Sequence, residues 1–157
     1  MTQAEPVLVL HPGDVALGGR GDRMQTLLGS CVSIILTDPR RTIGAMCHIV
    51  HSTQDTRHRS PSTSDASVAL QTMVEMLQSR GLSASLCEAY VYGGGNMFPG
   101  LVEGTTVGDH NAQWALEALA DMGVNVLSVD VGGNYYRQLH WTVGPDAPKV
   151  TAVPTSA

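Results

Sequence analysis

Charged residues, lysine and phenylalanine are scarce in this sequence, and each scarcity excludes a class of protein. Charged residues make up 15% of the 157 positions and hydrophobic residues 43%, whereas a disordered chain needs high charge and few apolar side chains. The formal net charge is −5, and Lys149 is the one lysine, which argues against nucleic acid as the main partner. With one Phe, the core must be built from aliphatic side chains and methionine. We therefore expect a single domain over residues 1–157.

Cysteines and long hydrophobic runs are also few. The three cysteines, Cys31, Cys47 and Cys87, include no Cys-x-x-Cys pair, so we expect neither a disulfide framework nor a metal site. No stretch of 18 residues is apolar and free of charge, as a membrane-spanning helix requires. The N-terminal apolar run at 7–10 is too short for a signal peptide. These absences predict a cytoplasmic protein with reduced thiols.

Hydrophobic periodicity predicts seven strands and two helices. One helix is expected between a cap at Ser64 or Asp65 and a stop at Gly81, and the other over 110–122. The strands are expected at 6–10, 31–37, 43–50, 86–92, 124–130 (a buried strand), 136–143 and 148–153. A polar loop at about 53–64 and the tail at 154–157 are expected to be mobile.

Two neighbouring strands, 31–37 and 43–50, carry the sharpest structural prediction. Apolar residues alternate along both, and both apolar faces should lie on the core. That condition pairs 32 with 49, 34 with 47 and 36 with 45, or the same register shifted by two, because a shift of one residue would turn one apolar set outward. On the opposite face this register places Ser33 across from His48. Cys31 is then the diagonal neighbour of His48, at about 7–8 Å between backbones.

A thiol beside an imidazole is the arrangement that attacks acyl groups. The thiolate is the nucleophile, and a nearby histidine activates it. The spacing alone leaves a structural alternative open, in which Cys31 is a small buried hydrophobe and His48 a structural histidine. Cys47 and Cys87 lie on apolar patterns, so we expect both in the core.

Longer motifs add to this pair. The segment Leu28-Gly29-Ser30-Cys31-Val32, followed by Gly44-Ala45-Met46 before His48, closely resembles the CheD family of chemoreceptor glutamine deamidases. The likeness continues in family order through Tyr92–Phe98, Val107–Asn111 and Asp130–Asn134, with Arg137 after them.

The resemblance implies an α+β fold, a single α/β/β layered sandwich related to the catalytic domain of cytotoxic necrotizing factor toxins. It implies hydrolysis of selected glutamine side-chain amides on methyl-accepting chemotaxis receptors to glutamate and ammonia, without a cofactor. The family's nucleophile maps onto Cys31 and its histidine onto His48. The third catalytic position maps onto Thr26 or, in the spacing of some relatives, onto Gln25.

The remaining expectations surround this catalytic group. Backbone amides at Gly29 and Ser30 are expected to support the oxyanion. Ser33, Asn96 and Asn111 are expected to lie on the substrate side or to be structural. The stretch from His51 to Ser64 departs from the family pattern. That departure keeps two other functions open: a non-enzymatic chemotaxis module that binds receptors or the CheC phosphatase, and a cysteine amidase or transglutaminase-like enzyme with a different protein substrate.

Overall fold

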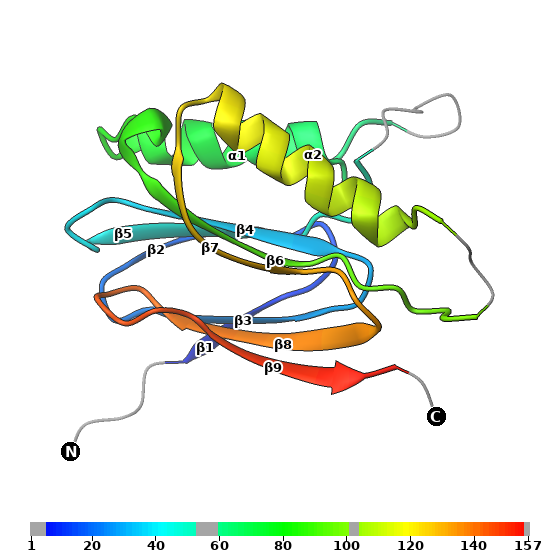
Figure 1. The fold of residues 1–157 in the computed structure, drawn as a ribbon. Coiled ribbons are helices and arrows are strands. Elements are labelled where there is room, and N and C mark those ends of the chain that lie inside the picture. The colour runs from blue at the N-terminus through cyan, green and yellow to red at the C-terminus, as the bar shows by residue number, and fades with distance from the viewer. Residues whose placement is uncertain (1–5, 53–59, 101–103, 156–157) are drawn as a thin grey trace, which may run out of the picture.

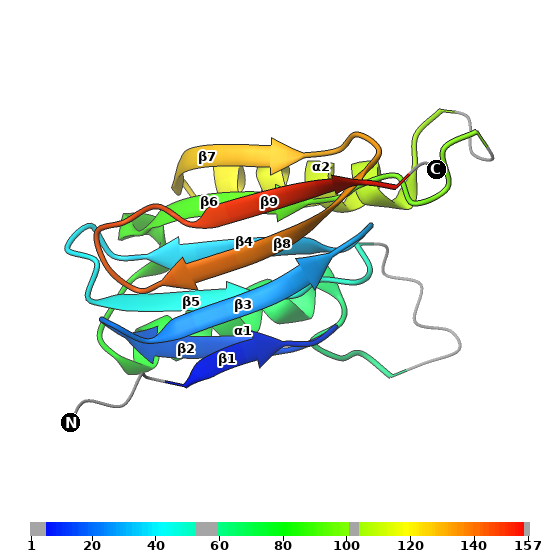
Figure 2. The same cartoon turned by 90° about the horizontal axis from the view of Figure 1, so that it is seen from below.

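The chain folds into three layers, seen edge-on in Figure 1 and from below in Figure 2. A computed structural model describes residues 6–52, 60–100 and 104–155. The middle layer is a five-stranded sheet in the order β2 (Val15–Gly19), β5 (Ile43–Cys47), β4 (Val32–Thr37), β6 (Glu88–Gly93) and β7 (Asn125–Val131). The second sheet runs β1 (Val7–Leu10), β3 (Arg23–Leu28), β8 (Tyr135–Thr142) and β9 (Lys149–Pro154). The helices α1 (Ala66–Ser79) and α2 (Val107–Asp121) cover the other face of the five-stranded sheet, and a short 3₁₀ helix, η1 (Ala84–Leu86), precedes β6. This confirms the α/β/β sandwich.

Two apolar cores hold the layers together. The residues of β4 are all buried, because β4 lies in the middle of the middle sheet. Val32, Ile34 and Leu36 face the helices, while Ile35 packs with Met46 against the four-stranded sheet. β4 therefore determines which side chains face the helices and which lie between the sheets.

The predicted register of the β4–β5 hairpin is confirmed. Leu36 pairs with Ala45, and a separate bridge joins Val32 to Ile49. Cys31 packs against the core between the two sheets. His48 contacts an inward-facing side chain of β3 there, Thr26. Cys31 and His48 thus lie on the same side of the sheet, as the alternation predicts.

Several other expectations need correction. The expected buried strand at 124–130 is β7, an edge strand with mostly exposed residues. The second helix begins at Val107, not at residue 110, because Thr106 and Asp109 form a reciprocal capping box that starts it earlier. β2 and β3 were not predicted as strands. β2 ends in Gly18 and Gly19, and glycine is rare in strands.

The two segments expected to be mobile lie partly outside the described residues. Nothing is described for 53–59 or 156–157. Pro154 belongs to β9, and the Thr155 backbone N–H donates to the Asn134 carbonyl at 3.0 Å. The tail is thus held at least as far as Thr155. In the described part of the chain, no helix combines the length and the apolar character that a bilayer crossing demands.

Candidate active site

His48 is fixed by a hydrogen-bonded chain that runs through two strands of the other sheet. It is 3% exposed, and its Nδ1 lies 2.7 Å from Thr26 Oγ1. The Thr26 hydroxyl donates to the Leu10 carbonyl at 2.7 Å. Because a hydroxyl has one proton to donate, Thr26 accepts from Nδ1–H, and the lone pair of the ring lies on Nε2. This is the tautomer that a general base requires.

The same geometry distinguishes between Thr26 and Gln25, the two candidates for the third catalytic position that the resemblance implies. Thr26 is buried, pairs with Leu10 and Leu139 across the sheet, and contacts His48. Gln25 points to the opposite face of β3, as the alternation of buried and more exposed residues along the strand shows. Thr26 is therefore the side chain that contacts the histidine, and it acts as a positioning residue for the ring.

Cys31 is half-buried and lies immediately before β4. Within the described residues, the Cys31 thiol makes no hydrogen bond, so none joins it to His48 in this conformation. Such contacts are often long without substrate and shorten when it binds. The described residues also contain no group of three metal-ligating side chains.

Burial favours the neutral forms of both side chains. It raises the pKa of the Cys31 thiol above its usual range. Burial also lowers the pKa of His48, and the Leu10 backbone carbonyl and, after it, the Asp14 carboxylate oppose this effect only in part. The resting pair is thus a thiol and a neutral imidazole, the protonation states in which an imidazole can accept a thiol proton.

Cys31 should react with iodoacetamide faster than the other two cysteines, because it alone is accessible and beside a histidine. Burial raises the pKa of Cys47 to about 12 and that of Cys87 to about 11. Peptide mapping by mass spectrometry after brief alkylation of the folded protein measures the three rates. Preferential labelling of Cys47 or Cys87 would contradict the assignment of Cys31.

A glycine-rich loop after β6 holds the segment that carries Cys31. The Gly94 N–H donates to the Cys31 carbonyl and the Gly95 N–H to the Gly29 carbonyl, both at 2.9 Å. Gly93 has a φ of 110°, and a Cβ there would lie 2.2 Å from the Cys31 carbonyl oxygen. Only glycine allows this approach.

Arg137, a residue of β8, binds the glycine-rich loop through its side chain. Its buried guanidinium donates to the carbonyls of Gly93 (3.2 Å) and Gly132 (2.8 Å) and pairs with Asp130 at 3.2 Å. The segment Asp130–Asn134 and the following Arg137, both part of the family resemblance, therefore support the glycine-rich loop that holds the Cys31 segment.

The backbone amides beside Cys31 are free to bind an oxyanion. In the part of the chain that the structure describes, neither the Ser30 nor the Cys31 N–H donates to another group, and the Gly29 N–H likewise has no acceptor. The expected support from Gly29 and Ser30 is compatible with this geometry. One free donor aimed at the developing charge contributes roughly 3–4 kcal/mol.

Ser33, Asn96 and Asn111 are the residues for which the sequence predicted either a substrate-side or a structural role. Their burial differs. Ser33 and Asn111 are fully buried, which favours structural roles. Asn96 is half-buried, and its Oδ1 accepts from the Phe98 N–H at 3.0 Å. Asn96 also lines a pocket of about 410 Å³ that includes Ser30, the residue before Cys31.

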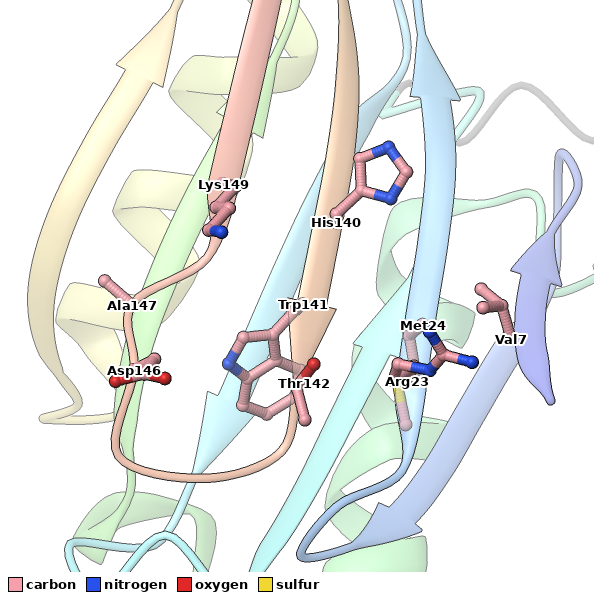
Figure 3. Close-up of a pocket in the computed structure, with 9 residues that line it drawn as sticks. All are labelled: Val7, Arg23, Met24, His140, Trp141, Thr142, Asp146, Ala147 and Lys149. Atoms are coloured by element: carbon pink, nitrogen blue, oxygen red, sulfur yellow. The ribbon is translucent and has the colours of Figure 1, made fainter. Parts of the chain in front are cut away.

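A second pocket, of about 360 Å³, lies away from this site on the outer face of the four-stranded sheet (Figure 3). It is at the Arg23 end of β3, whereas Cys31 follows the Leu28 end. Figure 3 shows the nitrogen-bearing ends of Arg23, His140 and Lys149 spread across the pocket and not directed at one point. The pocket contains no member of the catalytic group.

Comparison with known proteins gives consistent results. A family model described as CheD chemotactic sensory transduction matches residues 50–146, a range that begins after both Cys31 and His48. A relative from Albidiferax ferrireducens, named probable chemoreceptor glutamine deamidase CheD 2, is 36% identical over 87% of this chain and 81% of its own length. The chemoreceptor glutamine deamidase CheD of Thermotoga maritima is 32% identical over 74% of this chain and 72% of its own.

A solved structure shows the same fold at low sequence identity. The crystal structure of a Neisseria meningitidis protein of the DUF152 family model matches 89% of this chain and 76% of its own, with a TM-score of 0.54 and 14% identity. At this identity the likeness concerns the fold alone.

Proposed function

Because this chain belongs to the CheD family, we propose that it is a chemoreceptor glutamine deamidase, a hydrolase that converts receptor glutamine side chains to glutamate and ammonia. Relatives with this name match most of the chain. The observation that carries the proposal is the Thr26–His48 contact of 2.7 Å, with Cys31 on the same side of the sheet. This arrangement suits nucleophilic attack on an amide.

The reaction begins with proton transfer from the Cys31 thiol to His48 Nε2. The thiolate attacks the carboxamide carbon of the glutamine, and the resulting oxyanion accepts hydrogen bonds from the free amides at Ser30 and Cys31. His48 then gives its proton to the leaving nitrogen, ammonia departs, and a thioester remains. Water, deprotonated by His48, hydrolyses the thioester to glutamate and restores the thiol. Throughout, the Nδ1–H bond to Thr26 keeps the ring in place.

The proposal needs no cofactor and places the enzyme in the cytoplasm. Every step uses a side chain or a backbone amide of this chain. The three cysteines are free thiols, and the mechanism requires Cys31 to remain reduced. The receptors are the protein substrate.

Intact-mass analysis of receptor cytoplasmic fragments tests the proposal. Incubation with the protein should raise the fragment mass by about one dalton per converted site, since an amide becomes an acid. Fragments with the modified glutamines replaced by glutamate should show no further change. If the receptors bind but their mass never changes, the protein is a binding module and not a deamidase. Conversion of glutamines only on unrelated proteins would indicate a different amidase.

A further inference from the structure

We propose that Asn111 is a positioning residue that sets the separation between Cys31 and His48; this inference rests on the proposed function. Asn111 lies on α2, in the helical layer, and among the described residues its hydrogen bonds go to neither of the two side chains. Its carboxamide instead joins the two backbone segments that carry them.

The strands β4 and β5 separate near the catalytic pair. Their last bridge joins Val32 and Ile49, whose N–H groups each donate to the other's carbonyl, at 3.0 and 2.8 Å. Beyond this bridge the backbones of Ser30 and Val50 are not bonded to each other. Asn111 Nδ2 donates to the Ser30 carbonyl and to the Val50 carbonyl, at 3.1 Å each. The side chain thus acts as one more rung beyond the last rung of the hairpin.

Asn111 can adopt this orientation only. Its two Nδ2 protons face two carbonyl acceptors, so a flipped amide would place Oδ1 against both of them. The side chain is 0% exposed, and its Oδ1 has no partner among the described residues. A buried acceptor without a partner is destabilising. The two hydrogen bonds from Nδ2 offset this cost, because they bridge the backbone segment before Cys31 and the segment after His48.

The helix that carries Asn111 is itself held against the glycine-rich loop. A Cβ on Gly108 would lie 2.4 Å from the Gly94 carbonyl oxygen, so α2 contacts the glycine-rich loop directly. The same Gly94 binds the Cys31 carbonyl through its N–H. Asn111 therefore acts from a fixed support. Cys31 follows Ser30 directly and His48 lies two residues before Val50, so the rung controls their spacing.

Loss of the rung should impair the chemical step more than substrate binding. Misplacement of reacting groups by about 1 Å can lower a rate about 100-fold. We expect Asn111→Asp to lower kcat by about 10- to 100-fold, with KM changed by less than about twofold. The carboxylate has the same shape as the amide but no protons to donate. Asn111→Ala, which removes the donors without adding charge, should act in the same direction and covers the case in which the aspartate variant does not fold.

Leu119→Ala is the matched control. Leu119 lies on the same helix and is also 0% exposed, but it packs in the helix-side core and touches neither carbonyl. It should lower Tm as much as the Asn111 variants and leave kcat unchanged at temperatures well below Tm. Wild-type kcat in Asn111→Asp, or an equal loss of kcat in Leu119→Ala at the same loss of Tm, would overturn the proposal.

A second measurement needs no substrate. The rate of Cys31 alkylation against pH should show an inflection from His48 in the wild type, because a nearby imidazole changes the reactivity of a thiol when it titrates. The inflection should disappear in Asn111→Asp and Asn111→Ala and persist in Leu119→Ala. If the wild type converts no receptor, the proposed function fails, and this profile alone decides the positioning role: an inflection that persists in both Asn111 variants overturns it.

Discussion

Replacing Cys31 by alanine should abolish receptor deamidation, by at least about 10⁴-fold, and leave the fold and receptor binding intact. The substitution removes the nucleophile but only a small, half-buried side chain. His48→Ala should reduce turnover to a similar extent, since the thiol then lacks its base. The double variant should be no worse than either single one, because the two groups act as a unit. Receptor mass and receptor pull-down, measured on the same samples, separate chemistry from binding.

Cys87→Ala provides the control for this series. Cys87 is buried in the helix-side core and has no contact with the site, so this variant should lose some stability and keep its turnover. A Cys31→Ala protein that still converted glutamine at the wild-type rate would exclude Cys31 as the nucleophile. Losses that add in the double variant would show that His48 acts outside the Cys31 step.

Gly95→Ala should cost about 3 kcal/mol of unfolding free energy, the upper part of the usual range for overpacking. A Cβ at Gly95 would lie 2.0 Å from the Tyr135 carbonyl oxygen and 2.9 Å from Met97 Cε. The first of these neighbours is backbone, so the loop must move, and the Gly95–Gly29 hydrogen bond would be lost with it. Urea unfolding should show a lower midpoint with an unchanged slope.

Gly19→Ala is the comparison for this effect. Neither Gly19 nor Gly95 has a φ in the left-handed region, and the nearest atom to a Cβ on Gly19 is 3.9 Å away. The Gly19 variant should therefore stay within about 0.5 kcal/mol of the wild type. Equal stability losses at the two positions would mean that the close approach at Gly95 is not what excludes a side chain there.

The placement of Cys31 and His48 on one side of the sheet could be predicted from the sequence because it depends on local alternation. The apolar faces of β4 and β5 admit few registers, and the one observed puts Cys31 and His48 on the same side. The same reasoning could have decided the third position, since β3 also alternates. Thr26 shares its buried face with Met24 and Leu28, whereas Gln25 does not.

The rest of the site depends on contacts that leave no local pattern. Asn111 reaches Ser30 across 81 positions of sequence, and no periodicity within α2 indicates this contact. The exposure of β7 was missed for a related reason. Its hydrophobic composition suits a buried strand, but its position at the edge of the sheet is a property of the topology.

The last acceptor in the histidine's hydrogen-bonded chain is a main-chain carbonyl, that of Leu10. Every amino acid carries the same carbonyl, so substitution at position 10 leaves the acceptor itself in place and acts on the site only through the packing of the buried Leu10 side chain. What matters is that β1 runs parallel to β3 with Leu10 opposite Thr26. The orientation of the His48 ring thus depends on the backbone path of the first strand, because the last acceptor belongs to the main chain. Removing or displacing that strand, for example with a bulky fusion at its start, would disturb the chemistry without altering any catalytic side chain.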